Sequence, residues 1–280
     1  MANIGFVGLG MMGTPMAACL AKAGHALFVK DASAEVQASF VQNHGGQVLD
    51  SKTAADVEWL VLMLPNSAIV EKVLAELVSQ IPKTAAVIDM SSSAPLNTRA
   101  LSESLAEHGV QLLDAPVSGG QKRAIDGTLA IMVGGQAELY EKAEPILAAM
   151  GSAVHVGPVG AGHALKALNN YLSAAGLLAA VEAFHVGEKF GLDPAVMNKV
   201  FNTSSGRNNT TENKVEQFML SGKFNSAFSL ALMAKDLGIA VDLGEKMGEP
   251  MLLAHTCRDI WKEVDSRAPN ADHTEMYRLV

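Results

Sequence analysis

The sequence has few cysteines, little positive charge and no long apolar run. Only two of its 280 residues are cysteines, which is too few for a disulfide framework and favours a reducing compartment. The longest apolar run, from Ala174 to Val181, is far too short to cross a bilayer. Since no basic region or cleavage site precedes the strand pattern that starts at Asn3, we expect a cytoplasmic protein without a secretion signal.

The charge balance excludes further classes of protein. The chain has 21 Lys and Arg residues against 29 Asp and Glu, and its net charge of −8 argues against nucleic-acid binding, which requires a basic face. Its eight histidines are scattered without the spacing of metal ligands, so we expect no metal site. An apolar fraction of 49% and a charged fraction of 18% indicate an ordinary globular protein, long enough for two domains.

Short apolar runs alternate with amphipathic segments in the first half of the chain. The predicted strands are Ile4–Val7, Ala26–Lys30, Trp59–Leu64, Ala85–Met90, Gln111–Asp114, Leu129–Val133 and Ala153–Val156. The predicted helices are Met12–Ala23, Ala34–His44, Ser67–Ser79 and Asn97–His108. Because the strands are almost continuously apolar, this alternation predicts an α/β fold with a doubly wound parallel sheet covered on both faces.

The pattern changes after about Gly157. The segment from Gly157 to Gly162 is a turn-rich joint, and no convincing strand follows it. A long helix should run from about His163 to Phe190, where Gly191 ends it. The later predicted helices are Ala195–Asn202, Glu212–Ser221, Leu230–Met247 and Leu252–Val264. We therefore expect an NAD-binding domain over residues 1–161 and an all-α domain over residues 162–280.

A glycine-rich turn directly follows the first predicted strand and opens the first predicted helix. It spans Gly8 to Gly13 and reads GLGMMG, the dinucleotide-binding fingerprint in the context that this motif requires. The first glycine allows the tight turn, the second lets a pyrophosphate approach the backbone, and the third permits close helix–strand packing. Free amides at the helix N-terminus then bind the phosphates. The expected cofactor contacts are Gly8, Gly10, Met11, Met12 and Gly13.

Asp31 ends the next strand, where a carboxylate bonds the ribose hydroxyls of the cofactor. This favours NAD over NADP, because the carboxylate repels the extra phosphate and neither Ala32 nor Ser33 supplies an arginine to hold it. The alternative is that Asp31 caps the following helix. Two further strand ends, Leu64-Pro65-Asn66 and Asp89 to Ser93, should line the same crevice, either as nicotinamide-side contacts or as ordinary loops.

A second glycine-rich segment runs from Asp114 to Gly120. Its adjacent glycines, Gly119 and Gly120, expose backbone amides, and Ser118 adds a hydroxyl. This combination can hold a carboxylate without a fixed positive charge, and a flexible loop is the alternative. The following Lys122-Arg123 is either a solvated pair or a pair of substrate ligands.

Lys166 is the only formally charged side chain between Gly151 and Val181. Apolar surroundings disfavour the ammonium form of a lysine and lower its pKa, which makes the residue a usable acid or base near neutrality. On a helix, Asn169 and Asn170 share its face at i+3 and i+4. The alternative is a lysine that snorkels to solvent. Beside a nicotinamide site a proton-shuttling role is favoured, because removing a hydride from an alcohol requires loss of the hydroxyl proton.

In combination these motifs resemble the β-hydroxyacid dehydrogenase family, which includes 3-hydroxyisobutyrate dehydrogenase. The resemblance runs in order through Gly8 to Ala17, Asp114 to Gly120, Gly160 to Asn170, and Lys235-Asp236-Leu237. It implies an N-terminal Rossmann-type domain and a helical C-terminal domain joined by a long helix. It also implies homodimers or homotetramers, built partly through the helical domain.

The resemblance assigns roles to individual residues. It implies that Lys166 is the catalytic acid/base and that Asn170 helps to orient the substrate. It implies a hydroxyl contact to the cofactor from Ser92 and a lysine, Lys235, that reaches the cofactor and substrate cleft from the second domain beside Asp236. The other implied substrate ligands are Asn169, Ser118, Gly119 and Gly120.

The sequence departs from the family pattern in three places. Relatives acting on hydroxyisobutyrate carry a tryptophan soon after the arginine of Ser204-Ser205-Gly206-Arg207, whereas Asn208 and Asn209 follow here. Losing an aromatic wall should open or polarise the pocket near Arg207, so we expect a larger or more hydroxylated acid. Cys19 replaces the usual asparagine, and Ser91-Ser92-Ser93 replaces Ser-Thr-Ile with the hydroxyl kept.

We therefore predict an NAD-dependent oxidoreductase that interconverts a 3-hydroxyacid and its semialdehyde or 3-oxo acid, with Lys166 taking the hydroxyl proton. One alternative is a reductase of small aldehyde acids, such as tartronate or succinate semialdehyde, that uses the same site. An imine reductase is disfavoured, because such enzymes usually lack a lysine at the matching position. A non-catalytic dinucleotide-binding module is also disfavoured by the presence of Lys166.

Overall fold

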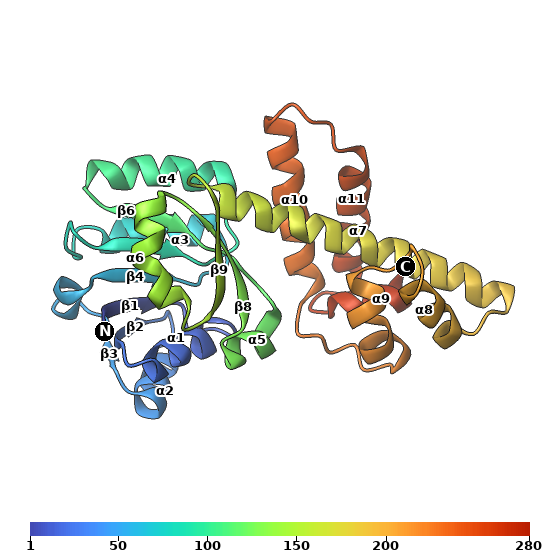
Figure 1. Cartoon of the computed structure of the whole chain (residues 1–280), viewed down its shortest axis with the longest axis horizontal. Helices are drawn as coiled ribbons and strands as arrows, with labels where there is room; N and C mark the ends of the chain where they lie inside the picture. The colour runs from blue at the N-terminus through green and yellow to red at the C-terminus, as the bar shows by residue number, and fades with distance from the viewer. The chain divides into compact units, whose positions relative to one another are not determined.

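All strands of the protein lie in its first 160 residues, and helices make up the remainder (Figure 1). The computed structural model describes residues 1–280, which divide into two units, Met1–Lys166 and Ala167–Val280. The long helix α7 (Ala161–Phe190) contributes residues to both units. Outside the sheet, the one isolated strand bridge pairs Ser229 with Asp272.

The N-terminal unit alternates strands with helices. Its strands are β1 (Asn3–Val7), β2 (Ala26–Lys30), β3 (Gln47–Val48), β4 (Trp59–Leu62), β5 (Ala86–Asp89), β6 (Gln111–Asp114), β7 (Val117–Ser118), β8 (Leu129–Gly134) and β9 (Gly151–Gly157). Its helices are α1 (Gly13–Lys22), α2 (Ala34–His44), α3 (Ser67–Leu77), α4 (Pro95–Glu107), α5 (Gly120–Asp126) and α6 (Ala137–Leu147), with a 3-10 turn at Thr53–Asp56.

The strands form one sheet in the order β3-β2-β1-β4-β5-β6-β8-β7, with β9 paired to β8. Neighbours from β3 through β6 are parallel, which confirms the predicted α/β class. The sheet is not parallel throughout, because β8 runs antiparallel to both β6 and β7. Short apolar runs carry no information on strand direction, so the sequence could not reveal this reversal.

Two separate cores cover the two faces of the sheet. On one face Ile4 and Phe6 of β1 pack with residues of α1 and α6, and on the other Val7 packs with residues of α3 and α4. This is the alternation that a strand with both faces buried requires. The strand order reverses between β1 and β4, so the crevice at the carboxyl ends of these strands is the expected ligand site.

The C-terminal unit consists of helices around a core that includes Phe184 and Trp261. After α7 come α8 (Pro194–Asn202), α9 (Asn209–Asn213), a π-helical segment (Val215–Leu220), α10 (Leu230–Lys246), α11 (Leu252–Arg267), a 3-10 turn (His273–Glu275) and α12 (Met276–Leu279). The prediction of a single helix from Glu212 to Ser221 is therefore wrong, because α9 and the π-helical segment divide this region. None of the protein's helices has both the length and the apolar character needed to span a membrane.

Candidate active site

The glycine turn connects β1 to α1 at the edge where the strand order reverses. Gly8 has φ of +99°, and a Cβ there would overlap the backbone of the segment after β4. A Cβ on Gly13 would overlap the carbonyl oxygen of Gly8, so the close helix–strand packing needs glycine here. A Cβ on Gly10 would meet nothing within 4 Å, which leaves the backbone open to a pyrophosphate. Met11 and Met12 lead from this open position into α1, whose first amides have no intrahelical acceptor.

Asp31 follows β2, and two backbone amides hold its carboxylate. Its Oδ2 accepts a hydrogen bond from the Leu9 amide at 2.7 Å, and its Oδ1 accepts one from the Ser33 amide at 2.9 Å. The cap of α2 is Ser33, whose hydroxyl accepts from the Val36 amide. Asp31 is thus tied to the glycine turn, and each carboxylate oxygen has a lone pair left for a ribose hydroxyl. These residues fit a dinucleotide.

The ends of β4 and β5 lie side by side at the same edge of the sheet. The amide of Leu64 donates to Oγ of Ser91 at 2.9 Å, which joins the two segments. Leu64 and Ser92 are half-buried, and Pro65 is exposed. Asn66 caps α3 by accepting from the amide of Ile69 at 3.1 Å. The parallel strands place this edge beside the glycine turn, as a nicotinamide-side contact requires.

The segment predicted to bind a carboxylate, Ser118 to Gly120, is a strand-to-helix turn. Ser118 ends β7, and Gly119 precedes α5. Both glycines have positive φ, +136° at Gly119 and +68° at Gly120, and both are exposed, so their amides are accessible. A Cβ on Gly119 would lie 2.5 Å from Cδ of Arg123, which means that the Arg123 stem folds over this glycine. Lys122 is exposed.

Lys166 lies in the second turn of α7 and is only 9% exposed. Ala167 is also buried, whereas Leu165 and Leu168 on either side are 42% and 38% exposed. The lysine therefore occupies the inward face of the helix and not the solvated face that snorkelling would use. Its amine can take up or release a proton within a largely enclosed position.

Four polar residues of the helical unit form one cluster. Asn170 is 5% exposed, and its Nδ2 donates to Oδ2 of Asp236 at 2.5 Å. The ammonium of Lys235 lies 3.2 Å from the other carboxylate oxygen of Asp236. Asn169 donates from its Nδ2 to Oδ1 of Asn170 at 3.2 Å. The fold thus brings together two motifs that are more than sixty positions apart in the sequence, with the buried Asp236 carboxylate between them.

Arg207 and Asn208 have local partners. Nε of Arg207 lies 2.8 Å from a carboxylate oxygen of Glu212, and the Arg207 side chain is 62% exposed. Asn208 caps α9, because its Oδ1 accepts from the amides of Thr210 and Thr211 at 2.8 and 3.2 Å. The asparagine that replaces the aromatic residue is therefore part of a capping box.

Three buried polar residues of the N-terminal unit have contacts that the sequence did not predict, although two of them belong to segments expected near the site. Asp89 and Asp114 are the last residues of β5 and β6, and His163 lies in the first turn of α7. Each is at most 1% exposed. The signal available was a carboxylate at the end of an apolar strand, since charged residues are rarely buried without a partner.

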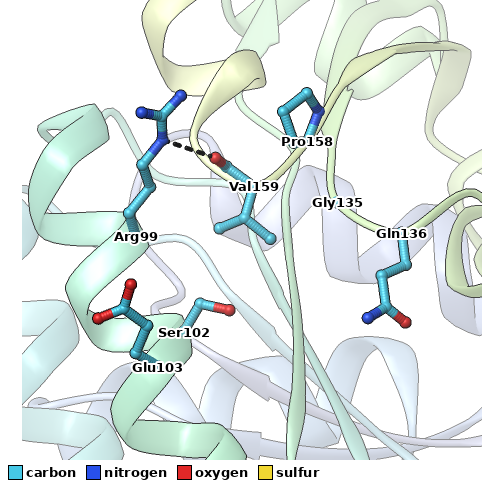
Figure 2. Close-up of a pocket in the computed structure, with 7 residues that line it drawn as sticks. All are labelled: Arg99, Ser102, Glu103, Gly135, Gln136, Pro158 and Val159. Atoms are coloured by element: carbon cyan, nitrogen blue, oxygen red, sulfur yellow. Dashed lines mark hydrogen bonds between the residues drawn. The ribbon is translucent and has the colours of Figure 1, made fainter.

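A hollow of about 430 Å³ lies between α4 and the segment that joins β9 to α7. Figure 2 shows the Arg99 side chain at one side of it, with Nε donating to the carbonyl of Val159 at 3.1 Å. None of the predicted cofactor or substrate contacts lines it. The structure also contains no group of three or more His, Cys, Asp or Glu side chains that could hold a metal ion.

Two family models match the chain. Residues 3–158 match the NAD binding domain of 6-phosphogluconate dehydrogenase, and residues 160–280 match the family described as NAD-binding of NADP-dependent 3-hydroxyisobutyrate dehydrogenase. Together they leave almost no part of the chain unmatched.

Known proteins are similar over nearly the whole length. 2-(Hydroxymethyl)glutarate dehydrogenase of Eubacterium barkeri is 38% identical over 266 residues, which are 93% of this chain and 88% of the relative. 3-Sulfolactaldehyde reductase of Escherichia coli strain K12 is 38% identical over 272 residues, 94% of this chain and 90% of the relative. The structure of Mycobacterium tuberculosis 3-hydroxyisobutyrate dehydrogenase with L-serine has a TM-score of 0.93 and 32% identity, and covers 99% of this chain and 98% of its own.

Proposed function

This chain belongs to the β-hydroxyacid dehydrogenase family, and we propose that it interconverts a small 3-hydroxyacid and the corresponding semialdehyde or 3-oxo acid, with Lys166 as acid/base. It is an NAD(P)-dependent oxidoreductase that acts on CH–OH donors. The observation that carries the proposed role of Lys166 is its burial in the second turn of α7, in the unit that also contains the glycine turn.

The proposed chemistry divides between the cofactor and the residues of the chain. The bound dinucleotide supplies the acceptor or donor of the hydride. In oxidation the neutral amine of Lys166 takes the proton of the substrate hydroxyl, and in reduction the ammonium returns it to the carbonyl oxygen. Ser118 and the amides of Gly119 and Gly120 hold the substrate carboxylate, which fixes the β-carbon by proximity. Asn170, held by Asp236, orients the substrate.

The relatives support a substrate that carries an acidic group. In such a substrate the carbon that is oxidised or reduced is attached to the carbon that bears the acidic group or the chain leading to it. The names of the two enzymes that are 38% identical specify a (hydroxymethyl)glutarate and a sulfolactaldehyde, and L-serine in the Mycobacterium tuberculosis structure is itself a 3-hydroxyacid. We therefore propose a small 3-hydroxyacid. Because one of these relatives is an aldehyde reductase, reduction of a small aldehyde acid by the same site is the second candidate.

The remaining site assignments belong to the same proposal. Gly8 to Gly13, Asp31, Leu64-Pro65, Ser92 and Lys235 would contact the cofactor. Asn169 and Arg207 would contact the substrate. We place the NAD-binding domain at residues 1–161 and the helical domain at residues 162–280. Asp31 is the reason to propose NAD as the preferred cofactor, because its carboxylate disfavours a 2′-phosphate.

We also propose a cytoplasmic homo-oligomer. Both cysteines are free, as a reducing compartment would leave them. Large apolar side chains are exposed along the helical unit, among them Leu172 and Val186 at 70% and Phe190 at 83%. Exposed apolar surface of this kind is typical of subunit contacts. A dimer or tetramer would bury it.

Substitution of Lys166 by Ala tests the proposed function. We expect turnover to fall by roughly 10²-fold or more, because a positioned general base contributes about that much, while NAD binding is retained. The assay follows NADH absorbance on mixing the protein with NAD and a panel of 3-hydroxyacids. Lys189→Ala, an exposed lysine near the other end of α7, is the matched control and should leave the rate unchanged.

Two results would count against the proposal. Near-normal turnover in Lys166→Ala would remove the acid/base assignment. Absence of any NADH signal across a broad panel, with NAD binding confirmed, would favour a dinucleotide-binding module without catalysis.

A further inference from the structure

A chain of buried hydrogen bonds connects the cofactor-side edge of the sheet to the first turn of α7. Its members come from β5 and the segment after it, β6, α4 and α7, so they lie far apart in the sequence. All are at most 2% exposed, so their polar atoms need partners inside the protein. They are Asp89, Ser91, Thr98, Asp114 and His163.

Asp114 holds the start of α7. Its Oδ1 accepts from the amide of Gly160 at 2.7 Å, and its Oδ2 accepts from the amide of His163 at 2.8 Å. The first amides of a helix lack intrahelical partners and carry a partial positive charge. A carboxylate here is therefore stabilised both by hydrogen bonds and by charge attraction. A Cβ on Gly162 would lie 2.8 Å from the Asp114 carbonyl oxygen, which shows how closely this turn rests on β6.

The ring of His163 adds a second attachment. Nε2 lies 3.1 Å from the carbonyl oxygen of Ser91, and because a carbonyl only accepts, Nε2 carries a proton. Nδ1 lies 2.8 Å from Oγ1 of Thr98, a hydroxyl that can donate to the ring or accept from it. Carboxylate oxygens of Asp89 and Asp114 lie 3.8 Å from Nε2 and Nδ1 respectively, so each ring nitrogen also has a carboxylate nearby.

Ser91 extends these attachments to the segments that we assign to the cofactor. Its hydroxyl accepts from the amide of Leu64, and its own amide donates to Oδ1 of Asp89 at 3.0 Å. The other oxygen of Asp89 accepts from the hydroxyl of Ser93 at 3.0 Å. The ends of β4 and β5 and the start of α7 are therefore parts of one hydrogen-bonded assembly.

Lys166 follows His163 by three positions on the same helix. Side chains on a helix lean back over the preceding turn, so we expect the stem of Lys166 to run over Gly162 and His163, the turn that Asp114 holds. A small shift of this turn moves the amine relative to the cofactor-side segments. The Asp114 carboxylate also places a negative charge beside the turn that the lysine covers.

We propose that Asp114 and His163 are positioning residues that fix Lys166 against the nicotinamide-side segments, an inference that rests on the proposed acid/base role of Lys166. Asp114 sets the height and orientation of the first turn of α7, and its charge favours the protonated amine. His163 locks that turn to the end of β5 through Ser91. Neither residue needs to touch the substrate.

Substitution of Asp114 by Asn is the first test. The variant keeps one acceptor but loses the negative charge and turns an amide toward a backbone N–H. We expect turnover to fall by roughly 10- to 100-fold, since small displacements of a catalytic group have effects of this size. We also expect the pH midpoint of the oxidation rate to move down by about half a unit, because a nearby negative charge favours the protonated amine. NAD affinity should change little.

A pair of substitutions at His163 is the second test, and it remains informative if Asp114→Asn fails to fold. His163→Gln keeps a donor for the Ser91 carbonyl and should retain at least half of the turnover. His163→Leu removes both ring contacts and should lose roughly tenfold or more. Rescue by the conservative variant is not expected of a residue that only fills space.

The matched control is Val110→Ala, a buried residue before β6, at the opposite end of the strand from Asp114. It should lower thermal stability without moving the pH midpoint. An unchanged pH midpoint and turnover in Asp114→Asn, equal turnover in both His163 variants, or the same midpoint shift in Val110→Ala would each overturn the inference. If Lys166→Ala is inactive while Asp114→Asn is normal, only this inference fails; if Lys166→Ala is active, the proposed function fails.

Discussion

Replacing Lys214 by Met should stabilise the helical unit at neutral pH. Burial lowers the pKa of Lys214 to about 8, and the charge of Asp272 only partly offsets this. Its Nζ donates a hydrogen bond to Oγ of Ser173 at 3.2 Å. These contacts therefore offset only part of the cost of burying the charged ammonium, whereas a Met side chain fills a similar volume without a charge.

The magnitude follows from linkage between protonation and folding. A pKa of 10.5 in the unfolded chain and about 8 in the folded protein corresponds to roughly 3 kcal/mol, which opposes folding wherever the amine is charged. Loss of the Ser173 hydrogen bond should cost about 1 kcal/mol. We therefore expect Lys214→Met to raise the free energy of unfolding by roughly 1–2 kcal/mol at pH 7.

The sign of the pH dependence is equally specific. Between about pH 8 and 10.5 the unfolded chain binds more protons at Lys214 than the folded protein does, so the free energy of unfolding of the wild type should rise with pH in this window. In Lys214→Met this rise should be lost. The advantage of the variant should therefore shrink as the pH is raised and disappear near pH 10.5.

Urea unfolding followed by tryptophan fluorescence provides the measurement. Trp261 is fully buried in the helical unit, and the chain has only one other tryptophan, Trp59 in β4. A Trp59→Phe background makes the signal specific to the helical unit. Lys199→Met, an exposed lysine of α8, is the control and should change little. A Lys214→Met variant less stable than its parent at pH 7 would refute the reasoning, as would a wild-type stability that does not rise above pH 8.

Two further predictions concern the candidate site, and a third concerns the free energy of unfolding at acidic pH. Asp31→Ala should weaken NAD binding and shift the relative preference toward NADP, with some loss due to the released Leu9 amide; an unchanged NAD/NADP ratio of affinities would contradict the ribose contact. Asp236→Asn should lower kcat/KM by roughly tenfold, because it removes the negative charge that pairs with Lys235 and leaves only a neutral acceptor for Asn170. A normal kcat/KM would show that this charge is not needed for turnover. Burial lowers the pKa of His273 to about 4, so the free energy of unfolding, measured by Trp261 fluorescence, should fall as the pH drops from about 6.5 to 4; a flat profile would contradict this.

The sequence predicts elements well where local chemistry determines them. The predicted strands Ala26–Lys30 and Gln111–Asp114 match β2 and β6, and the long helix to Phe190 is confirmed with a start at Ala161. Asp193 caps α8 as its position before a proline suggests, with Oδ1 accepting from the Ala195 amide at 2.7 Å. These features depend on apolar runs and caps within a few residues of one another.

Elements that break local rules were missed. Helix α6 carries Pro145 in its interior, which argues against a helix in a local reading. Helix α5 begins at Gly120, where adjacent glycines suggest a loop. The π-helical segment after Asn213 interrupts a continuous apolar pattern, and such segments depend on tertiary packing that the pattern does not encode.

The candidate site divides along the same line. A dinucleotide turn can be identified from sequence, because its glycines act on their own backbone and on the adjacent helix. The attachment of Lys166 cannot, because the ring of His163 bonds a carbonyl 72 positions away and its amide bonds a carboxylate 49 positions away. If that attachment is needed for turnover, then substitutions at Asp114 and His163 should impair catalysis while the motif residues remain intact. A sequence comparison limited to the residues that touch substrate or cofactor would then predict activity in variants that have lost it.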